Sequence, residues 1–446
     1  MPAPMSRAEA QRIVESAIRM SKAEGVSVQV GANVTGNTRF AANQLTTSGI
    51  IAANNFAVES FFGAKHAVVT TDDLSEASIR RAVEQSERLA KLAPDDPEVM
   101  PALPPQRYAA VNAFHEATAA ATPTERAQAA MSALEPARRA GDLMASGYIV
   151  TGANVIAQGN KAGMFAYHAA TTANYTLTVR TADGTGSGWA AADDKNWRTL
   201  DYRAVSQRAI DKARGSQNAV AIEPGKYTVI LEPQAVGDLV QLVVFYMDAR
   251  ASDEGRSPFV KPEGGNKIGE KIMDSRVTIL SDPSDPQLAG QPFDGDGLPL
   301  GRQVWVENGV LKQLYYSRFW AKKQGKTPTG GPSTVKMLGG PTSDEQMIAS
   351  TERGLLITRL WYLREVDPRT ALYTGLTRDG VFLIENGKVT RAVKNFRFNE
   401  SPLFMLNNIE AIGPAQRLAG TEVGGDVVMP SLKARDFNFT SLSEAV

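Results

Sequence analysis

The 446-residue chain contains no cysteine. This absence excludes disulfide bonds, thiol nucleophiles and thiolate metal ligands together. A chain without cysteine suits a reducing compartment, and its first residues, MPAPMSRAEAQRIVESAI, contain no apolar secretory core. We therefore expect a cytoplasmic protein.

Histidine is also scarce, with three residues, His66, His115 and His168, in the N-terminal half of the chain. No two of them have the spacing of metal ligands on one helix. His115 is followed by Glu116, as in a zincin motif, but the next turn holds two alanines where the second ligand is needed. We interpret His115 as a solvated helix or loop residue.

Excess charge and long apolar runs are absent too. Lysine plus arginine and aspartate plus glutamate both number 48, so no overall charge attracts nucleic acid or anionic lipid. No apolar run approaches the roughly 20 residues that span a bilayer. With 22% charged and 43% hydrophobic residues, the composition is that of a globular chain with roughly two to four domains.

Two glycine-containing segments resemble catalytic loops without completing them. Gly325-Lys326-Thr327 ends like a phosphate-binding loop, but the required earlier glycine is replaced by Trp320. The run from Gly184 to Gly188 lacks the order of a nucleophile elbow. We exclude nucleotide binding at the first segment and interpret the second as a hairpin turn.

Two acidic clusters could in principle hold a divalent cation. They are Asp193-Asp194 and Phe293-Asp294-Gly295-Asp296-Gly297. Neither has the spacing of a twelve-residue calcium loop that ends in glutamate. We interpret the second cluster as a structural turn that precedes a strand.

The N-terminal half contains several signals for helices. Ser6 with Glu9 forms a capping box for a helix over about residues 7–24, and a second helix is expected over about 74–92. A third begins at Thr122 and Pro123 and ends near Gly141. Alternating valines predict a strand from Val26.

A proline-dense connection and a run of strands complete this half. Five prolines between residues 94 and 105 exclude helix and central strand, so an extended surface crossover is expected. Residues 147–191 read as strands and hairpins, and a helix over about 201–214 precedes Pro224-Gly225, where we place the main boundary.

Strand and turn signals dominate beyond that boundary. Residues 303–314 and 381–393 each place Asn-Gly between apolar strands, which is a strong hairpin signal. One helix, capped by Ser343 with Gln346 and ended by Gly354, interrupts them. Because regular strand-helix alternation is missing, the fold class is predicted to be α+β rather than doubly wound.

The most informative stretch reads VILEPQAVGDLVQLVVFYMDARASDEGRSPF, from Val229 to Phe259. A short apolar strand leads to Pro233, which fits the first turn of a helix. Apolar residues at helical spacing from Ala235 then predict a mostly buried helix.

This stretch, in order with RFAANQ at residues 39–44, the proline connector, the Ser-Pro-Phe loop and the closing MPSLKARDFNFTSL, resembles the TldD/PmbA peptidase family, whose PmbA branch is also called TldE. The resemblance covers nearly the whole chain and implies a two-domain fold. We expect an N-terminal α/β domain over residues 1–105, a helix-plus-strand region packed with it over 106–225, and a β-rich C-terminal domain over 226–446.

In the zinc-bearing TldD branch, the helix after Pro233 carries the motif H-E-x-x-x-H. The matching residues here are Gln241, Leu242 and Tyr246. Zinc requires imidazole, thiolate or carboxylate ligands, and a peptidase also requires a carboxylate base; a neutral amide, an alkyl group and a phenol supply neither. The tail from Leu418, LAGTEVGGDVVMP, keeps the family's glycines but lacks its cysteine. Gln241 and Tyr246 are therefore either ordinary polar residues of a core helix or contacts for a substrate backbone.

The resemblance implies a PmbA/TldE-like, metal-free subunit that forms a heterodimer with a zinc-bearing TldD-like subunit and helps to degrade unfolded or extended peptides. No catalytic, cofactor-binding or metal-binding residue is expected in this chain, and zinc is expected in the partner. The family is also described as a modulator of DNA gyrase, but the balanced charge gives no basis for direct binding to DNA, and none is expected to membranes.

Two alternatives remain open. The chain could be a stand-alone hydrolase that uses serine, threonine or carboxylates, although nothing marks its nucleophile. It could instead be a vestigial peptide-binding homodimer. A local hypothesis concerns Asp253-Glu254-Gly255-Arg256-Ser257, which follows the zinc-motif helix and faces either a peptide, a partner or only solvent.

Overall fold

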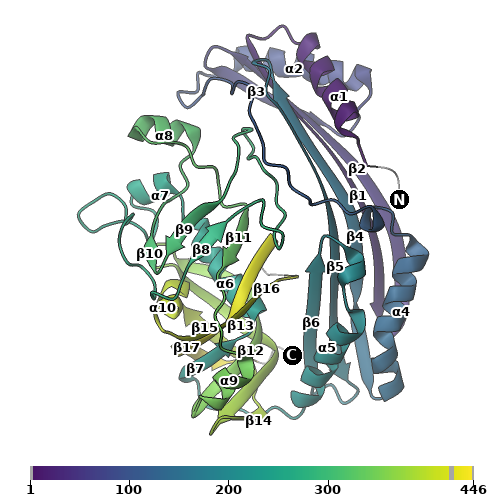
Figure 1. Cartoon of the computed structure of the whole chain (residues 1–446), viewed down its shortest axis with the longest axis vertical. Coiled ribbons are helices and arrows are strands. Elements are labelled where there is room, and N and C mark those ends of the chain that lie inside the picture. Colours follow the sequence, from purple (N-terminus) through teal and green to yellow (C-terminus); the bar gives the residue numbers. More distant parts are fainter. Residues whose placement is uncertain (1–3, 421–425, 444–446) are drawn as a thin grey trace.

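The computed structural model describes residues 4–420 and 426–443. Six antiparallel strands, four of them 17 to 19 residues long, form one sheet that runs the height of the molecule (Figure 1). In spatial order the strands are β3 (Lys65–Thr71), β2 (Gln44–Phe62), β1 (Gly25–Ala41), β4 (Leu143–Asn160), β5 (Phe165–Thr181) and β6 (Ser187–Asp194).

Four helices cover one face of this sheet. Helices α1 (Arg7–Met20) and α2 (Glu76–Leu92) pack on one end, and α4 (Pro123–Ala140) and α5 (Tyr202–Gly215) pack on the other. On β4, Leu143, Ala145 and Ile149 pack with α4 and α5, whereas Val155 and Ala157 pack with α1 and α2. All five are odd-numbered, so both helix pairs lie on the same face of the sheet. The other face of β5 buries Ala166 and Ala170 against the C-terminal half of the chain.

The β1–β2 hairpin explains the segment RFAANQ. Ala42 and Asn43 both have positive φ, 46° and 63°, which is the backbone pattern of a type I′ turn. The Asn43 side chain donates to the Leu143 carbonyl at 2.7 Å and accepts from the Ala145 N–H at 2.8 Å. The turn is thereby fixed to β4.

Two element boundaries differ from the sequence-based prediction. The first helix ends at Met20 instead of residue 24, because Ser21 turns extended and its hydroxyl donates to Glu87 at 2.8 Å. The helix predicted from Ser343 to Gly354 is α9 (Asp344–Ala349), and Gly354 instead pairs with Thr228 in a parallel ladder. A local cap signal carries no information about that long-range pairing.

The C-terminal half is built on a closed circuit of strands. β17 (Asp426–Leu442), β15 (Phe396–Glu400), β13 (Leu372–Glu385), β12 (Arg353–Asp367) and β7 (Gly225–Leu231) pair in that order, and β7 returns to β17. The remaining elements are β8 (Ile279–Ser281), β9 (Gln303–Glu307), β10 (Val310–Leu311), β11 (Thr334–Met337), β14 (Lys388–Ala392), β16 (Ile409–Arg417), α7 (Ala249–Asp253), α8 (Arg318–Gln324) and α10 (Pro402–Asn407), with α3 (Glu116–Ala119) and a 3-10 turn (Trp197–Thr199) in the N-terminal half.

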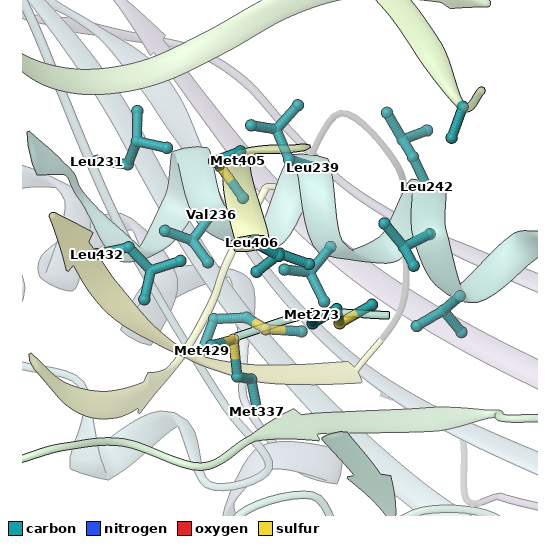
Figure 2. Packing of buried hydrophobic residues seen from close by; sticks show 14 of the residues in the cluster. Leu231, Val236, Leu239, Leu242, Met273, Met337, Met405, Leu406, Met429 and Leu432 are labelled. Carbon is teal, nitrogen blue, oxygen red and sulfur yellow. The ribbon is translucent and has the colours of Figure 1, made fainter. Parts of the chain in front are cut away.

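Helix α6 (Pro233–Phe245) packs against β7, β12 and β17, and all but its last residue are buried. Figure 2 shows Val236 and Leu239 on this helix and the methionines Met273, Met337 and Met429 packed together beside it. Unbranched methionine side chains adapt to the irregular space between a helix and several strands. The prediction of a mostly buried helix is confirmed.

Both predicted Asn-Gly hairpins are present. Asn308 and Gly309 have φ of 50° and 78°, and Asn386 and Gly387 have φ of 51° and 74°. They join β9 to β10 and β13 to β14. Helices and mainly antiparallel strands are both present without regular alternation, so the predicted α+β class is confirmed.

The proline connector has no helix or strand between residues 94 and 114 and contacts both halves of the molecule. The Leu103 carbonyl accepts from Asn160 at 2.9 Å, and the Tyr108 hydroxyl donates to the Gly297 carbonyl at 2.8 Å. Strands from either side of residue 105 share the six-stranded sheet, and the two boundaries between the three expected regions stay predictions. Within the described residues, no helix is both long and apolar enough to cross a membrane.

His66 fastens the connector to β3. Its Nδ1 lies 2.6 Å from Glu59 and its Nε2 3.0 Å from Asp96, while its ring stacks on Phe61. Burial alone would lower the pKa of His66, but the two carboxylates outweigh it and raise that pKa above its ordinary value.

We predict that His66→Gln destabilises the protein more at about pH 6 than at about pH 9. A raised folded-state pKa contributes stability below the unfolded pKa, and this contribution is lost as pH rises through the folded value. Because the ring is partly exposed, the difference should be about 1 kcal/mol or less. Urea unfolding at both pH values measures it, with His115→Gln as the control, and equal losses at both would contradict the prediction.

Candidate functional site

Helix α6 carries a polar stripe on an otherwise apolar surface. Gln234, Asp238 and Gln241 recur at positions i, i+4 and i+7, so they share one face, and all three are buried. Gln234 donates to Asp238 at 3.4 Å. The sequence analysis missed Gln234 and Asp238, although their helical spacing was a usable signal.

The three residues that match the zinc motif lie in different environments. Gln241 donates to the Gly237 carbonyl at 3.3 Å and lines a cavity at the C-terminal end of α6. Leu242 is buried in the main hydrophobic cluster. The Tyr246 hydroxyl donates to Glu365 and accepts from the Tyr373 hydroxyl at 2.9 Å. Of the three, only Gln241 lines this cavity.

The environment of Tyr246 keeps its hydroxyl protonated. Burial raises the pKa of Tyr246 far above the ordinary phenol value, and the hydrogen bonds with Glu365 and Tyr373 raise it further. A phenolate ligand is therefore disfavoured at this position.

The cavity has a volume of about 650 Å³. Phe245, at the last turn of α6, exposes 67% of its surface, and Val244 lies beside it in the wall. Among the described residues the wall contains the carboxylates Asp248, Asp294 and Asp426 but no lysine or arginine. Residues 421–425, which belong to the tail that lacks the family cysteine, lie outside the described residues.

Buried ion pairs join the two halves of the molecule beside this cavity. Lys195 lies 2.8 Å from Asp426, and Arg417 lies 2.7 Å from Asp193 and 2.5 Å from Asp426. Burial raises the pKa of Asp193 above its ordinary value. Burial also acts to raise that of Asp426, but Lys195 and Arg417 outweigh it and hold the value below its usual range.

This network explains one of the acidic clusters found in the sequence. The Asp193 carboxylate pairs with Arg417 and accepts from Asn174 at 3.3 Å, so it serves the junction between the halves. The sequence analysis did not link Asp193, Lys195, Arg417 and Asp426, because as many as 233 residues (from 193 to 426) separate them along the chain.

The second acidic cluster is a structural turn, as predicted. The Asp294 carboxylate accepts from the N–H groups of Asp296 and Leu298 at 3.0 and 2.9 Å, and Gly297 has a positive φ of 86°. The same turn forms part of the cavity wall. Burial raises the pKa of Asp294 above its ordinary value.

The loop from Asp253 to Ser257 does not line the cavity. Asp253 accepts from Asn266 and from the Trp320 indole, both at 2.8 Å, and the Ser257 hydroxyl donates to the Tyr246 carbonyl at 3.1 Å. These contacts give the loop a structural role at the exit of α7.

The remaining histidines lie apart from the cavity wall. His168 is buried on β5, where burial and then Lys195 lower its pKa to about 4, so it is neutral at pH 7. His115 precedes the short helix α3. In the described part of the chain, no three histidines, cysteines or carboxylates are grouped so that they could hold a metal ion.

Comparisons with known proteins agree with this architecture. The model of the PmbA/TldA metallopeptidase C-terminal domain matches residues 224–441. This match and the relatives described next support the resemblance to the TldD/PmbA family. An uncharacterized Methanocaldococcus jannaschii protein is 36% identical over 30% of this chain and 31% of its own length. A metalloprotease of Methanothermobacter thermautotrophicus is 26% identical over 49% of each chain.

The crystal structure of TldE from Thermococcus kodakarensis has the same fold. It superposes with a TM-score of 0.85 at 17% identity and covers 96% of this chain and 99% of that one. In contrast, the chain spans only about a third to a half of the length of the two curated relatives above. The likeness in fold therefore extends well beyond those sequence alignments.

Zinc, which this family implies, does not fit the residues at the motif positions. Gln241 presents a neutral amide, Leu242 is packed in the core, and Tyr246 is held as a protonated phenol by Glu365. This turn of α6 therefore offers no imidazole or carboxylate that could hold a zinc ion and its bound water.

We predict that Arg417→Met lowers the free energy of unfolding by about 3 kcal/mol, because it leaves Asp193 and Asp426 buried with fewer positive partners. Chemical denaturation measures the loss. The matched control is Arg435→Met on the same half of the chain, where the ion pair with Asp436 is exposed and the change should stay within about 0.5 kcal/mol. Equal effects of the two substitutions would contradict a stabilising role for the buried network.

Proposed function

We propose that this chain is the metal-free, PmbA/TldE-like subunit of a two-subunit peptidase whose zinc-bearing TldD-like partner cleaves unfolded or extended peptides. The observation that carries the proposal is the cavity at the end of α6, where Gln241 and Phe245 occupy the turn that bears the zinc motif in the TldD branch. In this proposal the chain holds peptide and completes the chamber, in the cytoplasm.

The wall of the cavity suits an extended peptide. Phe245 offers a largely exposed aromatic surface, and the amide of Gln241 carries both donor and acceptor atoms that match a peptide backbone. Apolar side chains of an unfolded substrate would pack on the ring, whereas a folded protein keeps such side chains buried. Selection of unfolded chains follows from that difference.

We predict that Phe245→Ala weakens binding of an unfolded, fluorescently labelled peptide about five- to tenfold, because burial of an aromatic ring on binding contributes about 1–1.4 kcal/mol here. Fluorescence anisotropy measures the affinity. The control is Phe404→Ala on α10, a phenylalanine that is 43% exposed and lies outside the cavity wall. Equal affinities for the two variants would contradict peptide binding in this cavity.

The subunit assignment is tested by co-expression with a zinc-bearing homologue, copurification, and peptide degradation by each chain alone and by the pair. We expect degradation only when both chains are present, and lower activity with Phe245→Ala in the pair. Chelator-resistant degradation by this chain alone would support a stand-alone hydrolase instead. Peptide binding without copurification or activation would support the vestigial homodimer.

A further inference from the structure

The outer face of β12, β13 and β15 gathers arginines around an exposed tryptophan. Residues that pair across neighbouring strands share a face, and so do residues two apart on one strand. The other side of these strands, with Leu360, Tyr373 and Phe398, packs into the main hydrophobic cluster. The strand register places the following eight residues together on the outer side, and we call them the arginine face: Arg359, Trp361, Arg364, Thr374, Leu376, Arg378, Arg397 and Asn399.

Contacts between arginines and aromatic rings order this face. The Arg378 guanidinium lies 4.8 Å from the centre of the Trp361 ring. The Arg359 guanidinium lies 5.7 Å from the same ring and 4.8 Å from the ring of Trp189 on β6. Trp361 is itself 39% exposed. A guanidinium that lies over a ring is held in place, yet it keeps N–H donors in its own plane for a planar acceptor such as a carboxylate.

A β-bulge turns a second aromatic ring outward beside this face. Tyr362 and Leu363 together stand opposite Gly375 in the ladder of β12 and β13. Tyr362 has a φ of 56°, which is rare for a bulky residue and strains the backbone. Its ring is 48% exposed, and Arg364 lies 4.1 Å from the ring centre. Bulges of this kind re-aim side chains and are frequent beside functional sites.

Arg378 has donor capacity that the fold does not use. Among the described residues its Nε has no hydrogen-bond partner and lies 3.8 Å from Asp379. That carboxylate is already held by Arg359 at 2.6 Å and by the Ser187 hydroxyl at 2.7 Å. Arg378 also pairs directly opposite Arg359, and like charges in that position destabilise a sheet. The fold therefore gains little from Arg378, whereas an anionic ligand would use both its charge and its donors.

No carboxylate on this face competes for the arginines. None of its eight residues is acidic. Of the acidic residues that follow on β12, Glu365 accepts from Tyr246 and Asp367 accepts from a backbone N–H in the β12–β13 turn. Arg364 and Arg397 are exposed. The face consequently presents positive charge and apolar ring surface side by side.

We propose that the arginine face binds an extended, acidic segment of another polypeptide. Carboxylates match the planar guanidinium donors, and tryptophan, tyrosine and arginine are the residues that contribute most to protein interfaces. None of the eight residues lines the cavity beside α6. The inference therefore does not depend on the peptidase role proposed above.

The strand register defines the spacing of the ligand. Arg364 pairs with Thr374, which is four residues from Arg378 on β13. These two rows of the sheet are about 13 Å apart, with the row of Trp361 and Leu376 between them. In an extended ligand, residues i, i+2 and i+4 share a face and span the same distance. The matching segment has acidic residues at i and i+4 and an apolar residue at i+2.

A polypeptide fits this face better than single-stranded nucleic acid does. Bases bind such surfaces by stacking on open aromatic rings. Here guanidinium groups already lie over the rings of Trp361 and Tyr362. The chain also carries 48 basic and 48 acidic residues, so its overall charge does not attract a phosphate backbone.

The test uses fluorescence anisotropy with the full chain and a labelled peptide whose core is Glu-Ser-Leu-Ser-Glu. We expect binding that weakens as salt is added, and affinity at least about fivefold lower for each of Arg378→Gln and Arg364→Gln. Arg391→Gln on β14 is the matched control, because this arginine is exposed and lies outside the face. Its affinity should stay within about twofold of the wild type. Circular dichroism checks that the variants are folded, and Arg364, being exposed, can be replaced without disturbing the core.

Two further ligands make the test specific. A peptide with the core Lys-Ser-Leu-Ser-Lys should not bind, and the core Glu-Glu-Leu-Ser-Ser, which has the same composition with another spacing, should bind at least about fivefold more weakly. No binding of the first acidic peptide, equal affinity for the acidic and basic peptides, or wild-type affinity in both arginine variants would overturn the proposal. Tighter binding of a labelled oligodeoxythymidine that is lost in Arg378→Gln would assign the face to nucleic acid and overturn it as well.

Discussion

The packing of helix α6 against three strands of a closed circuit, β7, β12 and β17, is the constraint on which the C-terminal half depends. The helix begins at Pro233 directly after β7, and β7 pairs with both β12 and β17. Because the circuit leaves little freedom, the side chains of the last helical turn are fixed in direction. Gln241 and Phe245 consequently reach the cavity, while Leu242 fills the core.

The same constraint explains how α6 packs with Gln241, Leu242 and Tyr246 at the positions that match the zinc motif. Twelve buried residues of α6 contribute apolar area or internal hydrogen bonds, and none requires an ion for its packing. Tyr246, Tyr373 and Glu365 form a hydrogen-bonded group at the helix end. A polar network that satisfies its own members keeps this end of the helix ordered.

Ion pairs, rather than apolar contact alone, orient the two halves beside the cavity. Arg417 bridges Asp193 on β6 and Asp426 at the start of β17, and Lys195 adds a second link to Asp426. Buried pairs contribute less net stability than their geometry suggests, but they disfavour other arrangements of the charges. We therefore interpret this network as a device that fixes relative position.

Features with local causes could be predicted from the sequence. The capping box of Thr122 and Glu125, the Asn-Gly hairpins and the buried helix after Pro233 all follow from residues within one or two turns of each other. Features with long-range causes could not. The lengths of β1 and β2, the closure of β7 on β17 and the meeting of Asp193 with Arg417 depend on partners far along the chain.

The same distinction between local and long-range causes applies to the candidate site. The sequence identified Gln241, Leu242 and Tyr246, but which of them faces a cavity depends on the strands around the helix. It did not identify Phe245, which is exposed although apolar, or Asp426, whose partners lie on the other half of the chain. The polar spacing of Gln234, Asp238 and Gln241 was visible and was overlooked.

The central claim is that α6 keeps its place without zinc. Elemental analysis of the purified chain, combined with thermal unfolding after zinc loading and after chelation, tests it most directly. We expect substoichiometric zinc and the same Tm in both states. One tightly held zinc per chain, with a Tm that falls when a chelator removes it, would contradict the claim.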